Sequence, residues 1–217
     1  VTILNVSKWL NSISIQTSDP AAITTISAFP FVQNVGGLAA RPGPGDRIDT
    51  RNKFALEEIT TPVPVSAGKQ EGIAGDFFNY GTSSFAEIHL HNGEFLHNIG
   101  MRGQGMQLAV LDGGFQNYTS LKAFDSAIAK GQILSTWDFV SSNATVVDDH
   151  WHGMQCLSTI AANIPGQFIG KAPKASFHLF RTEDVNSEYP IEEHNWVCGA
   201  ERADSTGADV ISSSLGY

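Results

Sequence analysis

Apolar and polar residues alternate with two different periods along the second half of the chain. Four short apolar runs have the length and the β-branched and aromatic content of buried strands, at residues 107–111, 133–139, 176–181 and 209–213. Three segments between them repeat apolar residues at helical spacing, at residues 120–130, 152–163 and 188–205. Strands that alternate with helices are typical of a parallel sheet with helices on both faces. We therefore predict an α/β domain that begins near residue 80.

Each predicted helix has an apolar face and a signal at its end. Leu121, Phe124 and Ile128 share one face of the first helix, which stops before Gly131, and the second helix ends before Pro165. The third helix carries an apolar stripe made of Trp196, Val197, Ala200 and Ala203. We expect these faces to pack against the sheet.

The first 36 residues form a separate, smaller pattern. Ile13 and Ile15 alternate with serines as in a half-buried strand, and Asp19-Pro20 opens a helix that stops at Pro30. Residues 31–35 then resume extended structure. A strand-helix-strand unit this small needs a surface to lie against, so we predict a small α+β unit docked on the larger domain.

Residues 37–79 have the composition of a linker. Proline and glycine are frequent there, and neither a helical nor an alternating period is present. A connection of this length is uncommon inside a compact domain. We expect it to move freely, to lie over the surface, or to be a site of cleavage.

Charge and composition exclude several classes of function. The formal net charge of -9, without a Lys/Arg cluster, argues against nucleic acid as a partner. No apolar run approaches the roughly 20 residues that a membrane-spanning helix needs. Two cysteines, Cys156 and Cys198, are too few for a disulfide framework, and we expect both to be buried thiols on helices.

The candidate chemistry lies at the end of the first strand of the predicted sheet. Asp112 follows an apolar run and precedes Gly113-Gly114, and His152 opens the helix that follows the next strand. Ligands of open α/β sheets gather at such strand ends, and a carboxylate beside an imidazole prepares it to act as a general base. On spacing alone a structural alternative stays open, in which Asp112 caps a turn and His152 caps a helix.

Several blocks of sequence, in order and spacing, resemble the subtilisin-like serine proteases, the subtilases. The blocks are Tyr80-Gly81 with Ile88, Leu96-His97 and Gly100; Ala109 to Gly114; His152-Gly153; Gly170 to Ala175; and Gly207 to Ile211 running into Ser214-Leu215-Gly216. The first 36 residues are similar to the second half of the inhibitory propeptide of this family. The resemblance implies the N-terminal half of a subtilisin-like parallel α/β fold, preceded by a propeptide remnant.

The resemblance also implies roles for individual residues. It makes Asp112 the orienting acid and His152 the general base, while the nucleophilic serine and the oxyanion-hole asparagine of the family are expected in sequence after Tyr217. Ser214, Leu215 and Gly216 would pair with an extended substrate peptide. Met154 departs from the threonine that is common in the family after His-Gly, which alters only the packing near the base.

The implied protein is a secreted or periplasmic serine endopeptidase in proenzyme form. Residues 1–36 would be the C-terminal half of the propeptide, 37–79 a linker, and 80–217 the N-terminal half of the peptidase domain. Its partners would be a peptide or protein substrate and the rest of the catalytic domain, either in the same polypeptide or as a separate chain that covers the apolar strand 209–213. Alone, these residues are expected to be inactive.

No cofactor is expected, and three alternatives remain. The loop at residues 163–170 lacks the side-chain oxygens of the calcium-binding versions in the family. A zinc site could use His89 and His91, or His150 and His152, if each pair lies in an extended segment. A pseudoprotease or peptide-binding scaffold would keep the sheet without the chemistry. A nucleotide-binding domain is disfavoured because no glycine-rich phosphate loop follows the aspartate strand.

Overall fold

The structure is a computed structural model that describes residues 1–38, 54, 75–186 and 189–216. In chain order its elements are β1 (Thr2–Ser7), β2 (Ser12–Gln16), α1 (Pro20–Ser27), α2 (Gly81–His89), α3 (Gly93–Asn98), β3 (Gln107–Asp112), the 3₁₀ helix η1 (Lys122–Phe124), α4 (Asp125–Ala129), β4 (Ile133–Asp138), α5 (His152–Ala161), β5 (Asn163–Ile164), β6 (Phe168–Ile169), β7 (Ser176–Arg181), α6 (Ile191–Ser205) and β8 (Val210–Ser213). Most of the predicted linker, residues 39–53 and 55–74, lies outside the described residues.

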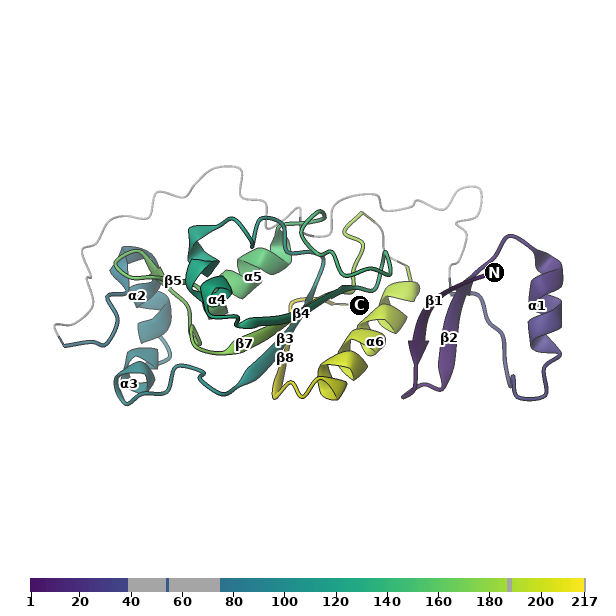
Figure 1. Ribbon diagram of the computed structural model, residues 1–217, viewed down its shortest axis with the longest axis horizontal. Coiled ribbons are helices and arrows are strands. Elements are labelled where there is room, and N and C mark those ends of the chain that lie inside the picture. The colour runs from purple at the N-terminus through teal and green to yellow at the C-terminus, as the bar shows by residue number, and fades with distance from the viewer. Residues whose placement is uncertain (39–53, 55–74, 187–188, 217) are drawn as a thin grey trace.

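A four-stranded parallel sheet is the centre of the fold, in the order β4-β7-β3-β8 (Figure 1). All three strand pairs are parallel, as the alternating pattern predicts. The predicted strands match the observed ones to within one residue at each end. In register, Arg181 lies between Asp112 on one side and Asp138 on the other, so the C-terminal ends of three strands meet at one edge.

Two apolar cores lie on opposite faces of this sheet. Val110 of β3 and Leu179 of β7 pack with Leu157 of α5 on one face. On the other face, Leu111 of β3 packs in a cluster that includes Ala203 of α6. Because neighbouring residues of a strand point to opposite faces, each central strand contributes to both cores. The prediction of helices on both faces is confirmed.

The apolar face predicted for residues 120–130 is only partly correct. Phe124 and Ala127 are buried, whereas Leu121 and Ile128 are 37% and 41% exposed. The segment starts as the 3₁₀ helix η1 and continues as α4. A 3₁₀ turn has three residues per turn instead of 3.6, so the side chains that face the sheet change along the segment. The other two helices are shorter than predicted: α5 ends at Ala161 and α6 begins at Ile191.

Two helices that the sequence pattern did not predict, α2 and α3, lie at the far end of the sheet from the N-terminal unit (Figure 1). A third apolar cluster, containing Tyr80, Ile88 and Ile169, joins α2 to the β5–β6 hairpin. The N-cap residues of the two helices, Tyr80 and Asn92, make no side-chain capping hydrogen bond, and α3 has only 6 residues. Both usual sequence signals of a helix, its caps and its length, are therefore weak here.

The N-terminal unit differs from the predicted strand-helix-strand. It is an antiparallel hairpin, β1 and β2, followed by α1. Asp19 caps α1 by accepting a hydrogen bond from the Ala21 amide at 2.9 Å, as predicted. Residues 31–35 form no strand. Extended residues need a partner strand for their backbone groups, and in this unit β1, which the pattern missed, is the partner of β2.

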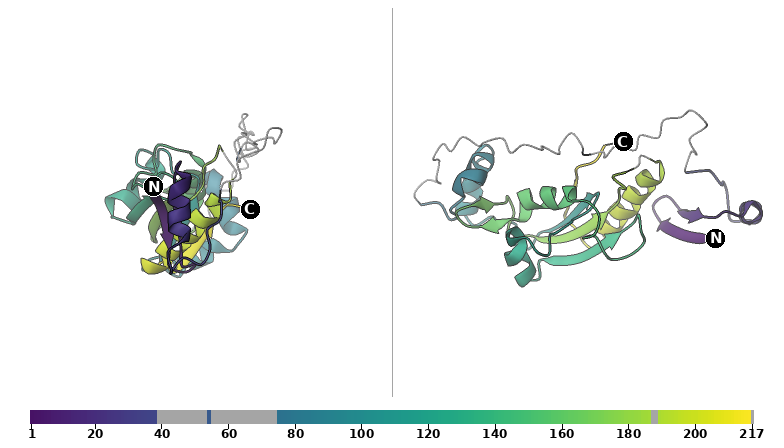
Figure 2. Two further views of the ribbon diagram at one scale, coloured as in Figure 1. Left: turned by 90° about the vertical axis from the view of Figure 1, so that its right-hand side faces the viewer. Right: turned by 90° about the horizontal axis from the view of Figure 1, so that it is seen from above.

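The buried face of the hairpin is polar, opposite to the prediction for β2. Ile13 is 57% exposed, whereas Ser14 is buried, together with Asn5 and Ser7 of β1. These polar residues face α6, beside which the hairpin lies in Figures 1 and 2. The Asn5 side-chain amide donates to the Phe139 carbonyl and to Asn195 Oδ1 of α6, both at 2.8 Å. Hydrogen bonds, rather than apolar packing, hold the hairpin on the larger domain.

No helix among the described residues is both long and apolar enough to cross a membrane.

Candidate active site

Asp112 is the last residue of β3 and is completely buried. The apolar residues before it keep β3 between β7 and β8, and the glycine turn that follows brings the Gly113 amide back to donate to Asp112 Oδ1 at 2.6 Å. The second oxygen, Oδ2, is buried without a hydrogen-bond partner among the described residues. Burial of this kind holds the carboxylate in one orientation at the edge of the sheet.

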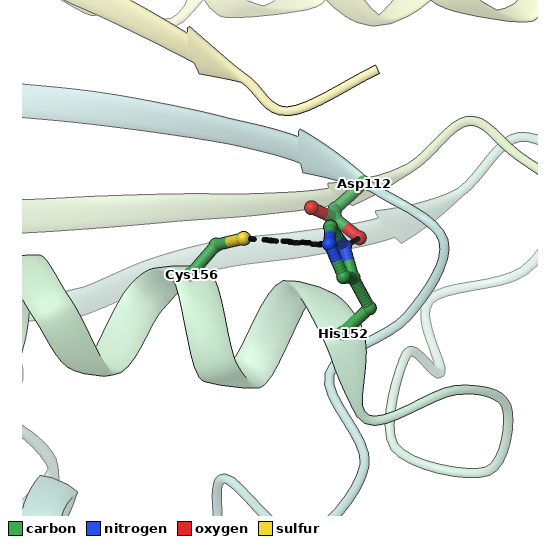
Figure 3. Close-up of side chains that lie close together, drawn as sticks. All are labelled: Asp112, His152 and Cys156. Atoms are coloured by element: carbon green, nitrogen blue, oxygen red, sulfur yellow. Dashed lines mark hydrogen bonds and ion pairs between the residues drawn. The ribbon is translucent and has the colours of Figure 1, made fainter. Parts of the chain in front are cut away.

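His152 is the first residue of α5, and its ring meets the Asp112 carboxylate (Figure 3). The distance from His152 Nδ1 to Asp112 Oδ1 is 2.7 Å, and the His152 residue is only 2% exposed. The His152 amide also donates to His150 Nδ1 at 3.2 Å, which caps the start of the helix. The two residues predicted to form the site therefore do meet.

Gly153 explains how the helix can approach so closely. A Cβ atom at this position would lie 2.5 Å from the Gly114 carbonyl oxygen and 2.7 Å from Asp112 Cβ. Only glycine fits between the helix and the turn after β3. The packing thus requires a glycine directly after His152.

The pKa of His152 is raised from its ordinary value to about 10. Burial alone would lower this pKa, but the hydrogen bonds to Asp112 and Cys156 and the negative charge of Asp112 outweigh it. The protonated imidazole is therefore stabilised by the carboxylate. An acid–base pair of this kind can accept a proton and hold the resulting positive charge.

Cys156 is a member of the site, although its sequence context predicts only a buried thiol. Its Sγ lies 3.9 Å from both ring nitrogens of His152, and the residue is half-buried (Figure 3). It follows His152 by four residues, so both side chains project from the same face of α5, and this spacing was the available signal. Cys198, on α6, is buried as expected.

Asp112, His152 and Cys156 are the only group of three metal-ligand side chains within 4.8 Å of one another in the described part of the chain. A sulfur, an imidazole and a carboxylate are donors that zinc accepts. The carboxylate and the ring nitrogen are, however, hydrogen-bonded to each other. The arrangement is that of an acid–base pair with a thiol beside it.

Neither histidine pair considered for zinc lies in an extended segment. His89 ends α2, and its Nδ1 lies 2.5 Å from Glu94 Oε1, while His91 follows in the turn after that helix. His150 precedes α5 and serves as the cap of His152. The zinc alternative required each pair to lie on one face of an extended segment, and that expectation is wrong.

Phe54 is a second residue of the site that the sequence does not predict. Its ring stacks on the His152 ring with centroids 3.6 Å apart and an angle of 9° between the planes. It is 6% exposed, and it also lies near the position where a Cβ on Gly113 would project. No period or motif around residue 54 could have indicated this contact.

Ser214, Leu215 and Gly216 follow β8, which pairs with β3. Since Leu111 is in register with Ser213, these three residues come to the same edge of the sheet as Asp112. Ser214 and Gly216 are exposed and Leu215 is half-buried. The predicted substrate segment is thus next to the predicted catalytic pair in the sheet.

Comparison with known proteins identifies relatives among proteases. Residues 103–217, just over half of the chain, match the Subtilase family, peptidase S8. The chain is 31% identical over 130 residues to the thermostable alkaline protease of Halalkalibacterium halodurans, covering 59% of this chain and 33% of that protein. It is also 31% identical over 124 residues to the minor extracellular protease Vpr of Bacillus subtilis, covering 55% of this chain and 15% of that protein. The chain therefore spans a third or less of these relatives.

Proposed function

Because the chain belongs to the subtilase family, we propose that it supplies the aspartate and the histidine of an Asp-His-Ser triad in a serine endopeptidase. Asp112 is the orienting acid, His152 is the general base, and the serine comes from sequence outside these 217 residues. The proposal rests on one observation, the buried 2.7 Å hydrogen bond between these side chains at the C-terminal edge of a parallel sheet.

The proposed reaction is acyl transfer to serine followed by hydrolysis. Since Nδ1 of His152 is engaged with Asp112, Nε2 is the nitrogen that takes the serine proton as the oxygen attacks the peptide carbonyl. Asp112 stabilises the imidazolium, which then protonates the leaving amine. Water, deprotonated by the same imidazole, attacks the acyl-enzyme and regenerates the serine.

The substrate is proposed to be an extended peptide or protein segment. Ser214, Leu215 and Gly216 would pair with its backbone beside β8, in the manner of an added strand. The exposure of Ser214 and Gly216 at the edge next to Asp112 supports this role. The name of one relative, an extracellular protease, supports a secreted or periplasmic location.

The proposed proenzyme consists of a propeptide remnant at residues 1–36, a linker at 37–79 and the peptidase part at 80–217. Docking of the hairpin on α6 supports a propeptide that packs on the peptidase. The stacking of Phe54 on His152 supports a linker segment that shields the base until it is removed.

Reaction with a serine-directed fluorophosphonate tests the proposal. We expect no labelling and no peptidase activity of the 217-residue chain alone, because loss of the triad serine lowers turnover about a million-fold in this family. Together with the rest of the catalytic domain, which would supply the nucleophilic serine, the assembly should cleave peptides and be labelled on that serine.

Two variants sharpen this test. His152→Ala in the assembly should abolish labelling, while His91→Ala, which changes an exposed histidine in a turn, should not. Labelling of a residue within the 217-residue chain would contradict the assignment. An assembly that binds peptides without cleaving them would instead support the scaffold alternative.

A further inference from the structure

We propose that Arg181 is a positioning residue for the Asp112–His152 pair, because its guanidinium joins the turn after Asp112 to the segment before His152. This inference rests on the proposed function of that pair. Arg181 does not touch the reacting groups, so it acts through the backbone that carries them.

The sheet places Arg181 at the centre of the edge that carries the site. It is the last residue of β7, the strand between β3 and β4. In register it is paired with Asp112 on one side and with Asp138 on the other. Because residues in register on parallel neighbours point to the same face, all three side chains lie on the face that α5 covers.

The contacts of the guanidinium extend to three separate segments. Nε donates to the Gly113 carbonyl at 3.2 Å, and Nη1 contacts Asp138 Oδ2 at 2.9 Å. Nη1 also lies 3.3 Å from Asp149 Oδ1 and 3.3 Å from Ser141 Oγ. Only 6% of the Arg181 side chain is exposed, so the interactions are little screened by solvent.

Two of these contacts lie next to the catalytic pair along the chain. Gly113 follows Asp112, and its amide donates to the same carboxylate oxygen that binds His152. Asp149 precedes His152 by three residues, and the next residue, His150, caps the His152 amide. Arg181 therefore contacts the chain next to each partner of the 2.7 Å hydrogen bond between Asp112 and His152.

The turn after β3 and the segment before α5 are packed so closely that neither can move without the other. A Cβ on Gly114 would lie 2.5 Å from the His150 amide nitrogen, so the turn after β3 and the segment before α5 are in direct contact. The Gln116 amide also donates to the His150 carbonyl at 3.0 Å. A shift of the Gly113 peptide is thus transmitted to the start of the helix.

The geometry requires an arginine rather than only a positive charge. Asp138 and Asp149 both face this one cation. Burial raises the pKa of Asp149 and the charge of Arg181 opposes this effect, while the nearby carboxylates, Asp138 among them, raise the pKa further. A lysine at position 181 would keep the charge but lacks the planar fork that reaches a carbonyl and two carboxylates together. Arg181→Lys therefore keeps the positive charge that neutralises Asp138 and Asp149 but removes the contacts that position the Asp112–His152 pair.

Two measurements on Arg181→Lys test the proposal. In the 217-residue chain, NMR titration of the His152 ring should give a pKa at least about one unit lower than in the wild type, since a longer Asp112–His152 distance weakens their interaction. In the assembled protease, kcat should fall about ten- to hundred-fold while KM changes less than about two-fold, because misplacement acts on the chemical step.

A matched control and a second variant complete the test. Arg202→Lys, which alters an arginine that stacks 4.5 Å from the Trp137 ring and faces the other core, should leave both quantities unchanged. Asp149→Asn, at a side chain that is 30% exposed, should act in the same direction but less, even if Arg181→Lys fails to fold.

The outcomes distinguish this inference from the proposed function. If both variants lower only the melting temperature, with the His152 pKa and kcat at wild-type values, Arg181 is purely structural and the inference is wrong. If the assembled wild-type protein does not cleave peptides, the proposed function fails, while the NMR titration still decides whether Arg181 positions the pair.

Discussion

One oxygen of Asp112 accepts two hydrogen bonds, from the Gly113 amide at 2.6 Å and from His152 Nδ1 at 2.7 Å. The first bond fixes the carboxylate, and the second fixes the tautomer of the imidazole. Burial alone would lower the pKa of His152, and the interactions with Asp112 and Cys156 together raise it instead.

Replacing Asp112 by asparagine should therefore lower the pKa of His152 from about 10, because burial still lowers it while the hydrogen bond and the charge of Asp112 no longer raise it. NMR titration of the ring carbon-bound protons would measure this change. If the proposed function is right, kcat of the assembled protease should fall about 10⁴-fold, the effect of the same change in a known Ser-His-Asp triad.

His178 provides an internal control for this titration. Burial lowers its pKa, and the nearby charge of Arg202 adds to the effect, so it does not depend on Asp112. Asp125→Asn, at an exposed carboxylate, should leave the His152 titration unchanged. An unaltered His152 pKa in Asp112→Asn would show that the two side chains do not interact in solution.

Gly153→Ala tests the close approach of α5 to the turn after β3. The new methyl group would lie 2.5 Å from the Gly114 carbonyl oxygen, which no side-chain rotation can relieve. We expect the free energy of unfolding to fall by about 1–3 kcal/mol, the usual cost of overpacking. Chemical denaturation of the chain would measure it.

Gly37→Ala is the matched control, since no atom lies within 4 Å of the added Cβ. Its unfolding free energy should equal that of the wild type within about 0.5 kcal/mol. Equal stability of Gly153→Ala and the control would contradict the packing at the start of α5.

At the scale of elements, the parallel sheet could be predicted from sequence because its strands combine strong periodicity with clear ends. β7 was predicted with both its ends, and Asp112 and His152 were placed at the end of a strand and the start of a helix. The contact between them follows from parallel topology, which brings distant strand ends to one edge.

Other elements and contacts could not be predicted because they depend on tertiary context. The hairpin buries Asn5 and Ser7 since polar groups of α6 and Phe139 provide partners for them, and no local pattern reveals those partners. Similarly, Phe54 lies in a segment without periodicity, and only the structure places its ring on His152.

Glu201 of α6 is the main anchor of the hairpin. Its carboxylate accepts hydrogen bonds from the Lys8 amide at 2.9 Å, the Trp9 amide at 3.2 Å and Ser7 Oγ at 3.0 Å. Burial would raise the pKa of Glu201, but these bonds, with the charge of Lys8, lower it overall. The docking energy of this group is therefore present above pH 4.5, its ordinary pKa, and is lost as the pH falls through the lowered value.

Glu201→Gln should loosen the hairpin without unfolding the sheet. A neutral amide is a weaker acceptor, and in this partly solvated site we expect backbone amides of β1 and β2 to exchange hydrogen about ten-fold faster at pH 7. Hydrogen exchange resolved by mass spectrometry would measure this effect. Glu193→Gln, at an exposed position on the same helix, should leave the exchange unchanged.

At the scale of the whole molecule, three parts of the chain converge on one edge of the sheet. The end of β3 carries Asp112, the start of α5 carries His152, and Arg181 at the end of β7 contacts the segments next to both. The segment after β8 lies beside them. Any reagent or mutation that acts on the Asp112–His152 pair should therefore also change the stability of the chain as a whole.

The pH dependence of the free energy of unfolding measures how much the Asp112–His152 pair contributes to the stability of the chain. Because the folded pKa of His152, about 10, exceeds its ordinary value of 6.5, the pair stabilises the folded chain fully below pH 6.5, and this stabilisation is lost as the pH rises to 10. The free energy of unfolding should fall by about 1.4 kcal/mol per pH unit, or about 2 kcal/mol between pH 7.5 and 9.

This pH window differs from the windows in which two other histidines and Cys198 affect the stability. His178 and His194 have lowered pKa values and act below pH 6.5, and Cys198, with a pKa raised to about 11, acts above pH 9. Urea denaturation at several pH values would measure the slope, and Asp112→Asn should reduce it, since the folded imidazole then loses its proton at a lower pH. A wild-type stability that is flat between pH 7.5 and 9 would mean that the imidazolium is not held by the carboxylate, and the acid–base role of the pair would lose its electrostatic basis.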